Sequence, residues 1–447
     1  MSHSPNHKGA ALKRIAAIAT VGTALLSFLI TSPATRRAIA QSTSVTFDNF
    51  ESPQIHSLAL TPDGTRLLAV NTPDNRLSVF QLTGGTPTLT LDIPVGLEPV
   101  SVAARNDTEA WVTNWLSDSV SIVNLTTGNV VRTIDVGDEP TDVVFAGTQH
   151  EMAFVCVAGL AQVKVYDPNA PTADPQVITI RGKQPRSLTR DPSNGRVFVS
   201  VFESGNQTTV VPSADVMASG GLPRPFPKMS KKLPPAPVTG LIVKWNGSKW
   251  ADAKGNTKWS QFIPYRLADV DVVVLDASGQ TAAVAAEIPG IGTNIGNTVL
   301  DPTGGRLYVV NTEALNLTRF LPNLRGHFLS NRVSIVGLGA GSPAITAVDL
   351  NPQVDFGVPT GSDQERAEGL ALPADIARGA DGTLYVAAKG SARVGVLDAN
   401  GAVQARIAVG RGPTGLAIDL GRNRLYVLNR FDETISVVDL SSRSEIS

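Results

Sequence analysis

The stretch RLYVLNRFDETISVVDL, residues 424–440, decides the fold class. Two short apolar runs, LYVL and ISVVD, flank the polar turn 429–433. This pattern predicts two antiparallel strands joined as a hairpin. The composition agrees, because the 447-residue chain has 40 Gly and 30 Pro and is dominated by Val, Thr, Gly and Asp after its first 40 residues. Such residues favour short strands joined by turns, so we expect an all-β protein.

Nearly the same phrase recurs along the chain. Its copies are separated by 43, 43, 44, 110, 77 and 41 residues and end at Asn71, Asn114, Val157, Val201, Asn311, Ala388 and Asn429. Five copies follow a proline that lies 15 to 17 residues upstream, namely Pro99, Pro140, Pro185, Pro373 or Pro413. A turn precedes the phrase, and a second turn, a Val-Ser-Ile-Val-type strand and a fourth strand ending in Val-Gly follow it. Each unit therefore indicates four antiparallel strands in roughly 42 residues, a typical length for one propeller blade.

A four-stranded sheet that is apolar on both faces is not stable alone. Packing such sheets face to face around an axis buries both faces, and this arrangement is the β-propeller. The seven copies predict a seven-bladed propeller over residues 41–447. We expect the second strand from the central channel to contain residues 67–70, 111–114, 154–157, 198–201, 307–310, 384–387 and 425–428.

The longer steps indicate inserts at about 212–265 in blade 4, with smaller ones at about 313–331 and 351–370. Residues 212–237 are rich in Pro, Gly, Ser and Lys, which predicts an extended loop. Residues 238–265 hold Trp245, Trp250 and Trp259 and predict a hairpin-like arm. Tryptophan is enriched among interface hot spots, so these side chains are candidate partner contacts. The alternative is that they pack on the propeller and pin the loop.

The first 40 residues have the plan of a secretory signal peptide. Lys8, Lys13 and Arg14 precede an apolar run at 15–30, and small residues precede a cleavage site after Ala40. We therefore expect an exported protein, either periplasmic or extracellular at the cell surface. The alternative is an uncleaved membrane anchor, because the apolar run is long for a signal peptide. Five of the 38 basic residues and no acidic residue lie in this segment, so the mature chain would have a net charge of −6 and nucleic acid is not an expected partner.

The Tyr-Val-x-Asn phrases after Pro-Asp-Gly-type segments resemble the YVTN-family, surface-antigen-like β-propellers, which are exported proteins of bacteria and archaea. The resemblance covers roughly residues 50–447. The segments GLIVKWNGSKWADAKGNTKWS (240–260) and GLALPADIARGADGTLYVAAKG (369–390), with the ending 425–440, resemble a subgroup in which a c-type cytochrome domain follows the propeller. That resemblance implies a cytochrome domain in cis or in trans as partner. The Cys-x-x-Cys-His motif that attaches haem is missing from this sequence, so no cofactor is expected in this chain.

Few residues suggest catalysis or metal binding. The single cysteine, Cys156, lies in an apolar run and is expected to be a buried structural thiol. His56, His150 and His327 are the histidines left after residue 40, and no pair has metal-ligand spacing; His327 is expected on the surface. Neither a Gly-x-Ser-x-Gly elbow nor a phosphate-binding Gly-rich loop occurs. Asp63, Asp301 and Asp381 are expected to form turns.

One set of polar positions remains as a candidate site. Two residues after the proline position of each unit, here called the inner position, lie Ser57, Ser101, Asp142, Ser187, Asn297, Asp375 and Gly415, and one residue earlier lie His56 and Arg186. We expect these residues at one mouth of the channel. They could simply fill a crowded, hydrated channel, or they could form a ligand or cation pocket with Asp142, Asn297 and Asp375 as oxygen donors to a divalent ion. The candidate ligand-binding residues are His56, Asp142, Arg186, Asn297 and Asp375.

Two functions are compatible with this sequence. The first is an exported, non-enzymatic scaffold that binds a protein or surface ligand, for example as the propeller part of a c-type cytochrome redox protein. The alternative is a metal-dependent hydrolase or lactonase that uses the channel mouth. Propellers host both, so the fold does not decide between them. The missing catalytic motifs and the Trp-bearing insert favour the scaffold.

The last unit leaves only residues 441–447 for its fourth strand. An uncovered sheet edge invites aggregation, so something is expected to cover it. Residues 41–50 could supply an outer strand, or the natural product could continue past Ser447 into the haem domain that the resemblance implies. We favour continuation.

Overall fold

The computed structural model describes residues 51–83, 86–221, 239–317, 327–339, 341–358 and 361–447. The chain divides into two compact parts, residues 1–48 and residues 49–447, and every described residue belongs to the second part. The predicted signal peptide, residues 41–50 and most of the loop at 212–237 lie outside the described residues. Within the ranges given, no helix is long and apolar enough to cross a membrane.

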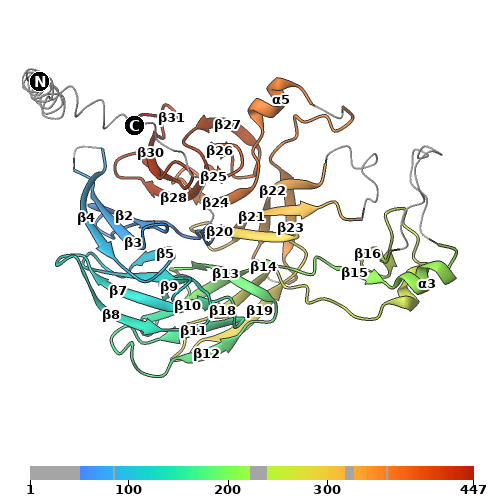
Figure 1. Ribbon diagram of the computed structural model, residues 1–447, viewed down its shortest axis with the longest axis horizontal. Coiled ribbons are helices and arrows are strands. Elements are labelled where there is room, and N and C mark those ends of the chain that lie inside the picture. The colour runs from blue at the N-terminus through green and yellow to red at the C-terminus, as the bar shows by residue number, and fades with distance from the viewer. Residues whose placement is uncertain (1–50, 84–85, 222–238, 318–326, 340, 359–360) are drawn as a thin grey trace, which may run out of the picture. The chain divides into compact units, whose positions relative to one another are not determined.

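Most of the described chain folds into antiparallel sheets of four strands (Figure 1). Three of them, in chain order, are β1 (Leu58–Leu60), β2 (Arg66–Asn71), β3 (Arg76–Gln81) and β4 (Thr88–Pro94); β5 (Pro99–Ala104), β6 (Glu109–Asn114), β7 (Ser119–Asn124) and β8 (Asn129–Asp135); and β9 (Pro140–Ala146), β10 (Met152–Val157), β11 (Gln162–Tyr166) and β12 (Gln176–Thr179). Two more are β24 (Pro373–Arg378), β25 (Leu384–Ala388), β26 (Arg393–Leu397) and β27 (Val403–Ala408); and β28 (Pro413–Asp419), β29 (Arg424–Asn429), β30 (Thr434–Asp439) and β31 (Ser444–Glu445). The all-β prediction is confirmed.

The remaining large sheet has eight strands and consists of two four-stranded sets. They are β13 (Lys183–Arg190), β14 (Arg196–Glu203), β18 (Val272–Asp276) and β19 (Ala283–Ile288); and β20 (Asn294–Leu300), β21 (Arg306–Ala314), β22 (Leu329–Gly337) and β23 (Ala344–Asp349). A single residue pair, Glu203 with Asn294, joins the two sets. Each four-stranded set is called a unit below, and the strand that begins it is its first strand.

The first strands of successive units lie next to one another (Figure 1). β1 contacts β5, and the contacts continue from β5 to β9, β13, β20, β24 and β28. β28 also contacts β1, so the last unit returns to the first. The recurring phrases of the sequence all lie in the second strand of a unit, namely β2, β6, β10, β14, β21, β25 and β29. This arrangement is that of a β-propeller.

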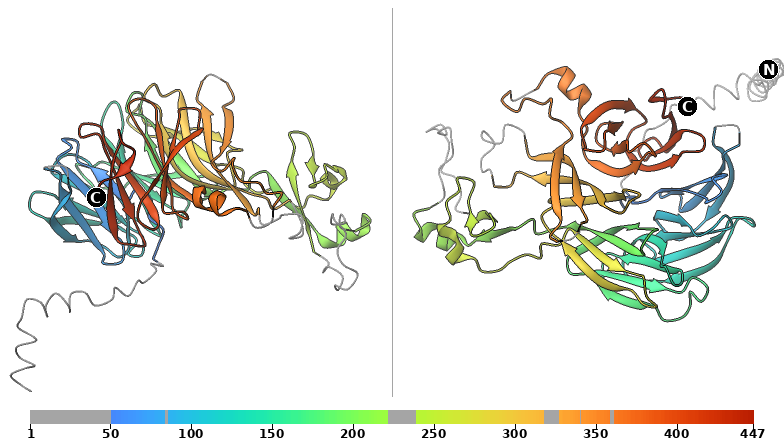
Figure 2. Two further views of the ribbon diagram at one scale, coloured as in Figure 1. Left: turned by 90° about the horizontal axis from the view of Figure 1, so that it is seen from above. Right: turned by 180° about the vertical axis from the view of Figure 1, so that it is seen from behind.

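The short elements outside these units belong to two inserts. The first insert contains β15 (Thr208–Val211), β16 (Leu241–Trp245), β17 (Trp250–Ala251), the helix α3 (Ser213–Ala218) and the 3-10 helix η1 (Lys258–Phe262). In Figures 1 and 2 it stands to one side of the large sheets. The second insert contains α5 (Asp363–Glu368), which begins with a capping box between Ser362 and Glu365. The predicted insert at 313–331 begins as an extension of the β21–β22 hairpin, because Ala314 pairs with Leu329.

In three of the four copies that end in asparagine, this asparagine holds the second and third strands of its unit together; Asn71 bonds to Asp74 instead. Its side-chain amide donates to a serine hydroxyl of the third strand at 2.8 to 3.0 Å, in the pairs Asn114–Ser121, Asn311–Ser334 and Asn429–Ser436. Both partners of each pair are buried. A buried amide needs such a partner, and this explains why the phrase and the Val-Ser-Ile-Val strand recur together.

A glycine from the preceding unit packs against the same asparagine. A Cβ atom at Gly96 would lie 2.6 Å from Asn114 Cγ, and one at Gly410 would lie 2.6 Å from Asn429 Cγ. At Gly292 it would lie 2.6 Å from the Oδ1 atom of Asn311. The glycine that follows the fourth strand is therefore favoured by the neighbouring unit, because a side chain there would displace the asparagine.

Turns that contain an aspartate connect the first and second strands of a unit, as predicted. The side chains of Asp63, Asp301 and Asp381 each accept a hydrogen bond from the backbone N–H two residues later, at 2.8 to 3.0 Å. These bonds help to lower the pKa of all three carboxyl groups.

Apolar clusters fill the space between neighbouring units. In one of them Phe154 and Cys156 of β10 pack with Val199 of β14 and Val273 of β18. Cys156 is fully buried, and burial raises the pKa of its thiol. It therefore lies where the sequence predicted, as part of the core.

Replacing Gly96 with Ala tests the contact between units. We expect the added methyl group to displace Asn114 and to lower the free energy of unfolding by about 1 to 3 kcal/mol, the usual effect of overpacking. The matched control is Gly339→Ala, because a Cβ atom there meets nothing within 4 Å. Thermal unfolding of both variants measures the difference, and equal melting temperatures would contradict this role for Gly96.

Candidate ligand site at the first strands

The proline at the start of a unit helps to set the direction of the side chain at the inner position. In the units that begin with Pro99, Pro140, Pro373 and Pro413 the register with the second strand shifts between the proline and the residue two positions later. Such a bulge leaves one residue unpaired and turns the side chains that follow. The residue before these prolines has a positive φ of 50° to 68°, at Glu98, Glu139, Leu372 and Gly412. The chain therefore enters each of these first strands through a sharp turn that sets the direction of the inner side chain.

Asp142 lies at the centre of the first polar network. Its Oδ2 atom accepts hydrogen bonds from His56 Nδ1 at 2.7 Å and from the backbone N–H of Leu188 at 2.6 Å. Its Oδ1 atom accepts from Ser101 Oγ at 2.6 Å and from the N–H of Val143 at 2.9 Å. The fully buried carboxyl group thus connects β5, β9, β13 and the segment before β1, and its lone pairs are all directed at protein donors.

Asp375 has a similar role and connects β20, β24 and β28. Its Oδ1 atom accepts from Asn297 Nδ2 at 2.9 Å and from the N–H of Ile376 at 2.8 Å, and its Oδ2 atom accepts from the N–H of Leu416 at 2.8 Å. Burial raises the pKa of Asp375, although these hydrogen bonds and the charge of His56 oppose the change. Two inner carboxyl groups therefore connect neighbouring units.

The segment 51–56 crosses the inner ends of the first strands and is called the entry segment here. The backbone N–H of Ile55 donates to Val100 O on β5 at 2.9 Å, while Ile55 O accepts from Asn297 Nδ2 on β20, also at 2.9 Å. Gln54 bonds to Thr72 and Thr414. Because β5 and β20 are not neighbours, the entry segment spans the space between them.

His56 ends the entry segment and is positively charged at neutral pH. Burial favours the neutral imidazole, but the Asp142 carboxylate, the hydrogen bond to it and the charge of Asp375 outweigh burial and raise the pKa of His56 to about 9. Its side chain is 26% exposed. A histidine that stays protonated at pH 7 is not available as a general base.

A cavity of about 280 Å³ lies beside the entry segment and is called the mouth pocket here. Two positions of the repeat supply much of its wall. The residue after the recurring phrase contributes Phe202, Thr312, Lys389 and Arg430, and the residue after the proline position contributes Arg186, Gly296, Ala374 and Thr414. The other lining residues are Pro53, Gln54, Asn294, Asn297, Leu329, Leu372 and Pro373. The mouth pocket therefore lies among the first and second strands of the last four units, with Leu329 of β22 and the entry segment.

Three cationic side chains line this pocket. Burial and the nearby charge of Arg430 lower the pKa of Arg186 to about 10. Burial and the charges of Arg430 and Arg186 also lower the pKa of Lys389. The lining contains no Asp or Glu residue. The pocket is thus a region of positive potential.

The predicted site residues separate into two groups. Arg186 and Asn297 line the mouth pocket, whereas His56, Asp142 and Asp375 form the buried network beneath the entry segment. Lys389 and Arg430 were missed, although they follow the recurring phrase directly and an alignment of that position would have exposed them. Among the described residues no group of three or more His, Cys, Asp or Glu side chains is arranged to hold a metal ion. His327 is half-buried and stacks on Phe356.

The three tryptophans of the first insert lie in or beside a small core of their own. Trp259 is 0% exposed and Trp250 is 6% exposed, and they pack with Val211, Val216 and Val243. Trp245 is half-buried and meets Trp250 edge to face, with 5.7 Å between ring centroids. The hairpin predicted at Asn246-Gly247 is present between β16 and β17. Trp250 and Trp259 are therefore core residues of the insert itself, whereas the alternative considered from the sequence was packing on the propeller.

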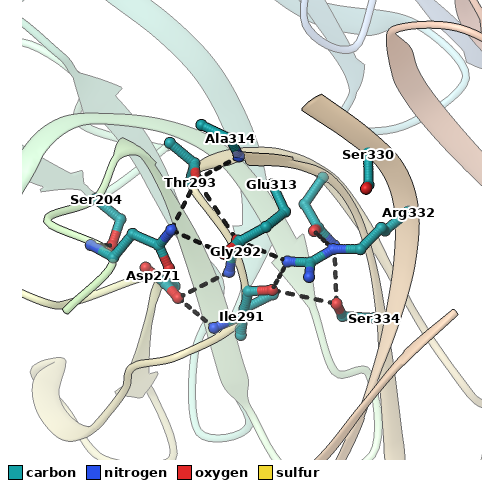
Figure 3. A network of polar contacts seen from close by, with 12 residues as sticks. Ser204, Asp271, Ile291, Gly292, Thr293, Glu313, Ala314, Ser330, Arg332 and Ser334 are labelled. Atoms are coloured by element: carbon teal, nitrogen blue, oxygen red, sulfur yellow. Dashed lines mark hydrogen bonds and ion pairs between the residues drawn. The ribbon is translucent and has the colours of Figure 1, made fainter. Parts of the chain in front are cut away.

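A polar network connects this insert to the propeller, and Figure 3 shows its propeller side around Glu313, Arg332 and Asp271. Glu313 accepts from Lys244 of the insert at 2.8 Å, from Asn206 at 3.1 Å and from Arg332 of β22 at 3.0 Å. Burial raises the pKa of Glu313, but these hydrogen bonds and the two cations outweigh burial and lower it. Where the insert returns to β18, Asp271 accepts from the backbone N–H groups of Ile291 and Gly292. The base of the insert is therefore held by charge-assisted hydrogen bonds.

The pKa of His56 predicts how stability changes with pH. A histidine whose folded-state pKa is raised stabilises the fold fully below about pH 6.5, and this contribution is lost as the pH rises through about 9. We expect the free energy of unfolding to fall between pH 7 and 10, and we expect His56→Gln to remove that part of the decrease. His327→Gln is the control, because burial lowers the pKa of His327 and leaves it neutral in this range. Urea unfolding at several pH values gives the slopes; identical slopes for wild type and His56→Gln would refute the assignment.

Trp259→Ala tests whether the tryptophans hold the insert together. The substitution removes a fully buried ring and the bond from its Nε1 atom to Asp252 at 2.9 Å. We expect it to destabilise the insert by about 3 to 5 kcal/mol, the usual range for a buried aromatic residue. Limited proteolysis should then cut faster between residues 239 and 270, while the half-buried Trp245→Ala variant shows a smaller effect. Unchanged protection in Trp259→Ala would mean that the ring is dispensable for packing.

Comparisons with known proteins support the fold. No family model matches the chain, and no curated protein matches it either. Among solved structures, a chain of hydrazine synthase from Kuenenia stuttgartiensis is similar with a TM-score of 0.59 and 17% identity, over 89% of this chain and 98% of that one. A protein of unknown function from Desulfotomaculum acetoxidans has a TM-score of 0.50 and 12% identity, over 82% and 88% of the two chains. At such identities the likeness concerns the fold alone, which is a β-propeller, and the YVTN resemblance stays a prediction.

Proposed function

We propose that this chain is an exported, seven-bladed β-propeller of the YVTN type that binds a ligand at its mouth pocket without transforming it. The seven four-stranded units, whose first strands contact one another in sequence and close from β28 to β1, support the blade number. Export rests on the signal-peptide pattern of residues 1–40. A protein or surface ligand, with a c-type cytochrome domain as one candidate, is the partner class that the sequence resemblance implies.

The observation that carries this proposal is the contrast between the acidic and the basic groups of the site. The carboxyl groups of Asp142 and Asp375 are occupied by protein donors and connect neighbouring units. Arg186 and Lys389, in contrast, face a cavity and have no ion-pair partner among the described residues. In this site the acidic side chains stabilise the fold and the basic side chains face the cavity. This arrangement fits ligand binding better than metal-dependent hydrolysis, which needs carboxylates that are free to coordinate the ion.

The hydrolase alternative retains one supporting observation, the His56–Asp142 pair. A histidine oriented by a carboxylate is a common general base. Here the raised pKa keeps His56 protonated at neutral pH, and Asp142 also binds Ser101 and Leu188. These features favour a structural ion pair over a catalytic one.

Metal analysis of the purified chain distinguishes the two functions. We expect calcium, magnesium, manganese and zinc to be substoichiometric, and we expect EDTA to leave the melting temperature unchanged, because the inner carboxylates already have protein partners. Lactone and ester substrates should not be hydrolysed. One tightly bound metal ion per chain, together with hydrolysis that EDTA abolishes, would reverse the proposal in favour of the hydrolase.

A further inference from the structure

The mouth pocket is lined by positive charge that no other lining residue neutralises. Arg186, Lys389 and Arg430 line it, and no carboxyl side chain does. Glu51 and Glu98 act on Arg430 and raise its pKa against the effect of burial, but neither glutamate belongs to the lining. The positive charge of Arg186 acts on Lys389 and contributes to the lowered pKa of Lys389. Like charges therefore lie near one another in the lining of the pocket.

The hydrogen-bonding capacity of these cations is largely unused. The guanidinium of Arg186 lies over the ring of Phe202, 4.3 Å from its centroid. Within the described parts of the chain, neither Arg186 nor Lys389 donates a side-chain hydrogen bond or forms an ion pair. Arg430 donates to the carbonyl oxygen of Glu51, but its buried Nε atom has no partner there. Arg186 and Lys389 are half-buried and Arg430 is buried, so each cation is partly removed from water. Partial removal of a cation from water is unfavourable, and an anion bound in the pocket would offset this.

The volume and the walls limit the size and character of such an anion. A cavity of about 280 Å³ is close to the lower end of the range of about 300 to 1,000 Å³ that small-molecule pockets have, so it has room for a small organic anion. Phe202, Leu329, Leu372 and Pro373 supply apolar wall, which suits a short carbon chain. A planar guanidinium binds two oxygens of one carboxylate or phosphate, while a lysine ammonium acts as a point charge.

We infer that the mouth pocket binds a small organic dianion, either a short dicarboxylate or a small phosphate monoester. Arg186 holds one anionic group by paired hydrogen bonds while stacked on Phe202. Lys389 neutralises the second charge, and Arg430 adds to the field and anchors the entry segment through Glu51. The inference rests on the proposed ligand-binding function and specifies the ligand class.

The test is isothermal titration of the purified chain with three probes of similar size. Glutarate and glycerol 3-phosphate represent the two sources of a dianion, and pentanoate is the monoanion of matched length. We expect at least one dianion to bind about tenfold or more tightly than pentanoate, since a charge-assisted hydrogen bond is worth at least that factor. The tighter of the two dianions names the class. No binding of either dianion to the folded protein would overturn the inference.

Variants locate the site. Arg186→Gln and Lys389→Gln should each weaken dianion binding by about tenfold or more. Arg132→Gln, which removes an exposed arginine of β8 outside the pocket, should leave the affinity unchanged. Without ligand, both pocket variants should melt at or above the wild-type temperature, because a repelled charge is removed; Lys389→Met repeats the test if the glutamine variant unfolds. Binding that survives both pocket substitutions would place the anion elsewhere and refute the assignment.

The two proposals fail in different ways. A stoichiometric metal ion with hydrolytic activity would remove the proposed non-enzymatic function whether or not glutarate binds. A folded, metal-free protein that binds neither dianion would remove only the inference about the ligand class, because a protein or surface ligand of another kind could still bind at the mouth pocket.

Discussion

Every four-stranded unit of this protein is apolar on both faces, and the structure depends on covering both. Strand β2 illustrates the constraint, because Leu67 and Leu68 point to opposite faces and both are fully buried. Leu67 packs with Tyr426 of the last unit, and Leu68 packs with Val112 of the next. A buried leucine contributes about 1.5 to 3 kcal/mol, which is lost if either neighbour is missing. The chain must therefore return on itself, and the contacts between asparagine, serine and glycine fix how closely the units approach.

Where the first strands converge, the polar groups must be satisfied without help from bulk water. Asp142 and Asp375 do this by accepting backbone hydrogen bonds from the next unit, at Leu188 and Leu416. The entry segment adds His56 and the carbonyl oxygen of Ile55 to the same networks. These carboxyl groups therefore act as connections between sheets, and their charge is balanced mainly by His56. A buried acid in this position is stabilising only because its partners are all in place.

Unlike the acidic residues, the basic residues Arg186 and Lys389 have no ion-pair partner among the described residues. This difference points to a function for the pocket that they line. Arg186 and Lys389 occupy positions of the repeat that other units fill with Thr141, Ala374 or Ala158. They lie around one cavity, next to the point where Glu203 and Asn294 join two units into one sheet. The insert that begins after β14 is held nearby by Glu313 and Lys244. The side of the propeller with the irregular connections is thus also the side with uncompensated charge, as expected where binding outweighs packing.

The sequence by itself determined the repeat, the strands that carry Leu-Tyr-Val-Leu and its relatives, the inner positions and the hairpin at Asn246-Gly247. These features depend on residues that are close in the chain, where strand alternation and turn chemistry act locally. Only the tertiary structure decided that His56 pairs with Asp142, that Trp250 and Trp259 are buried, and that Arg186, Lys389 and Arg430 share a cavity. Those contacts depend on how far each sheet rotates about the central axis and on the path of the entry segment across it. Neither is encoded in the period of the repeat, because the period sets the order of the units and not which side chains meet between them.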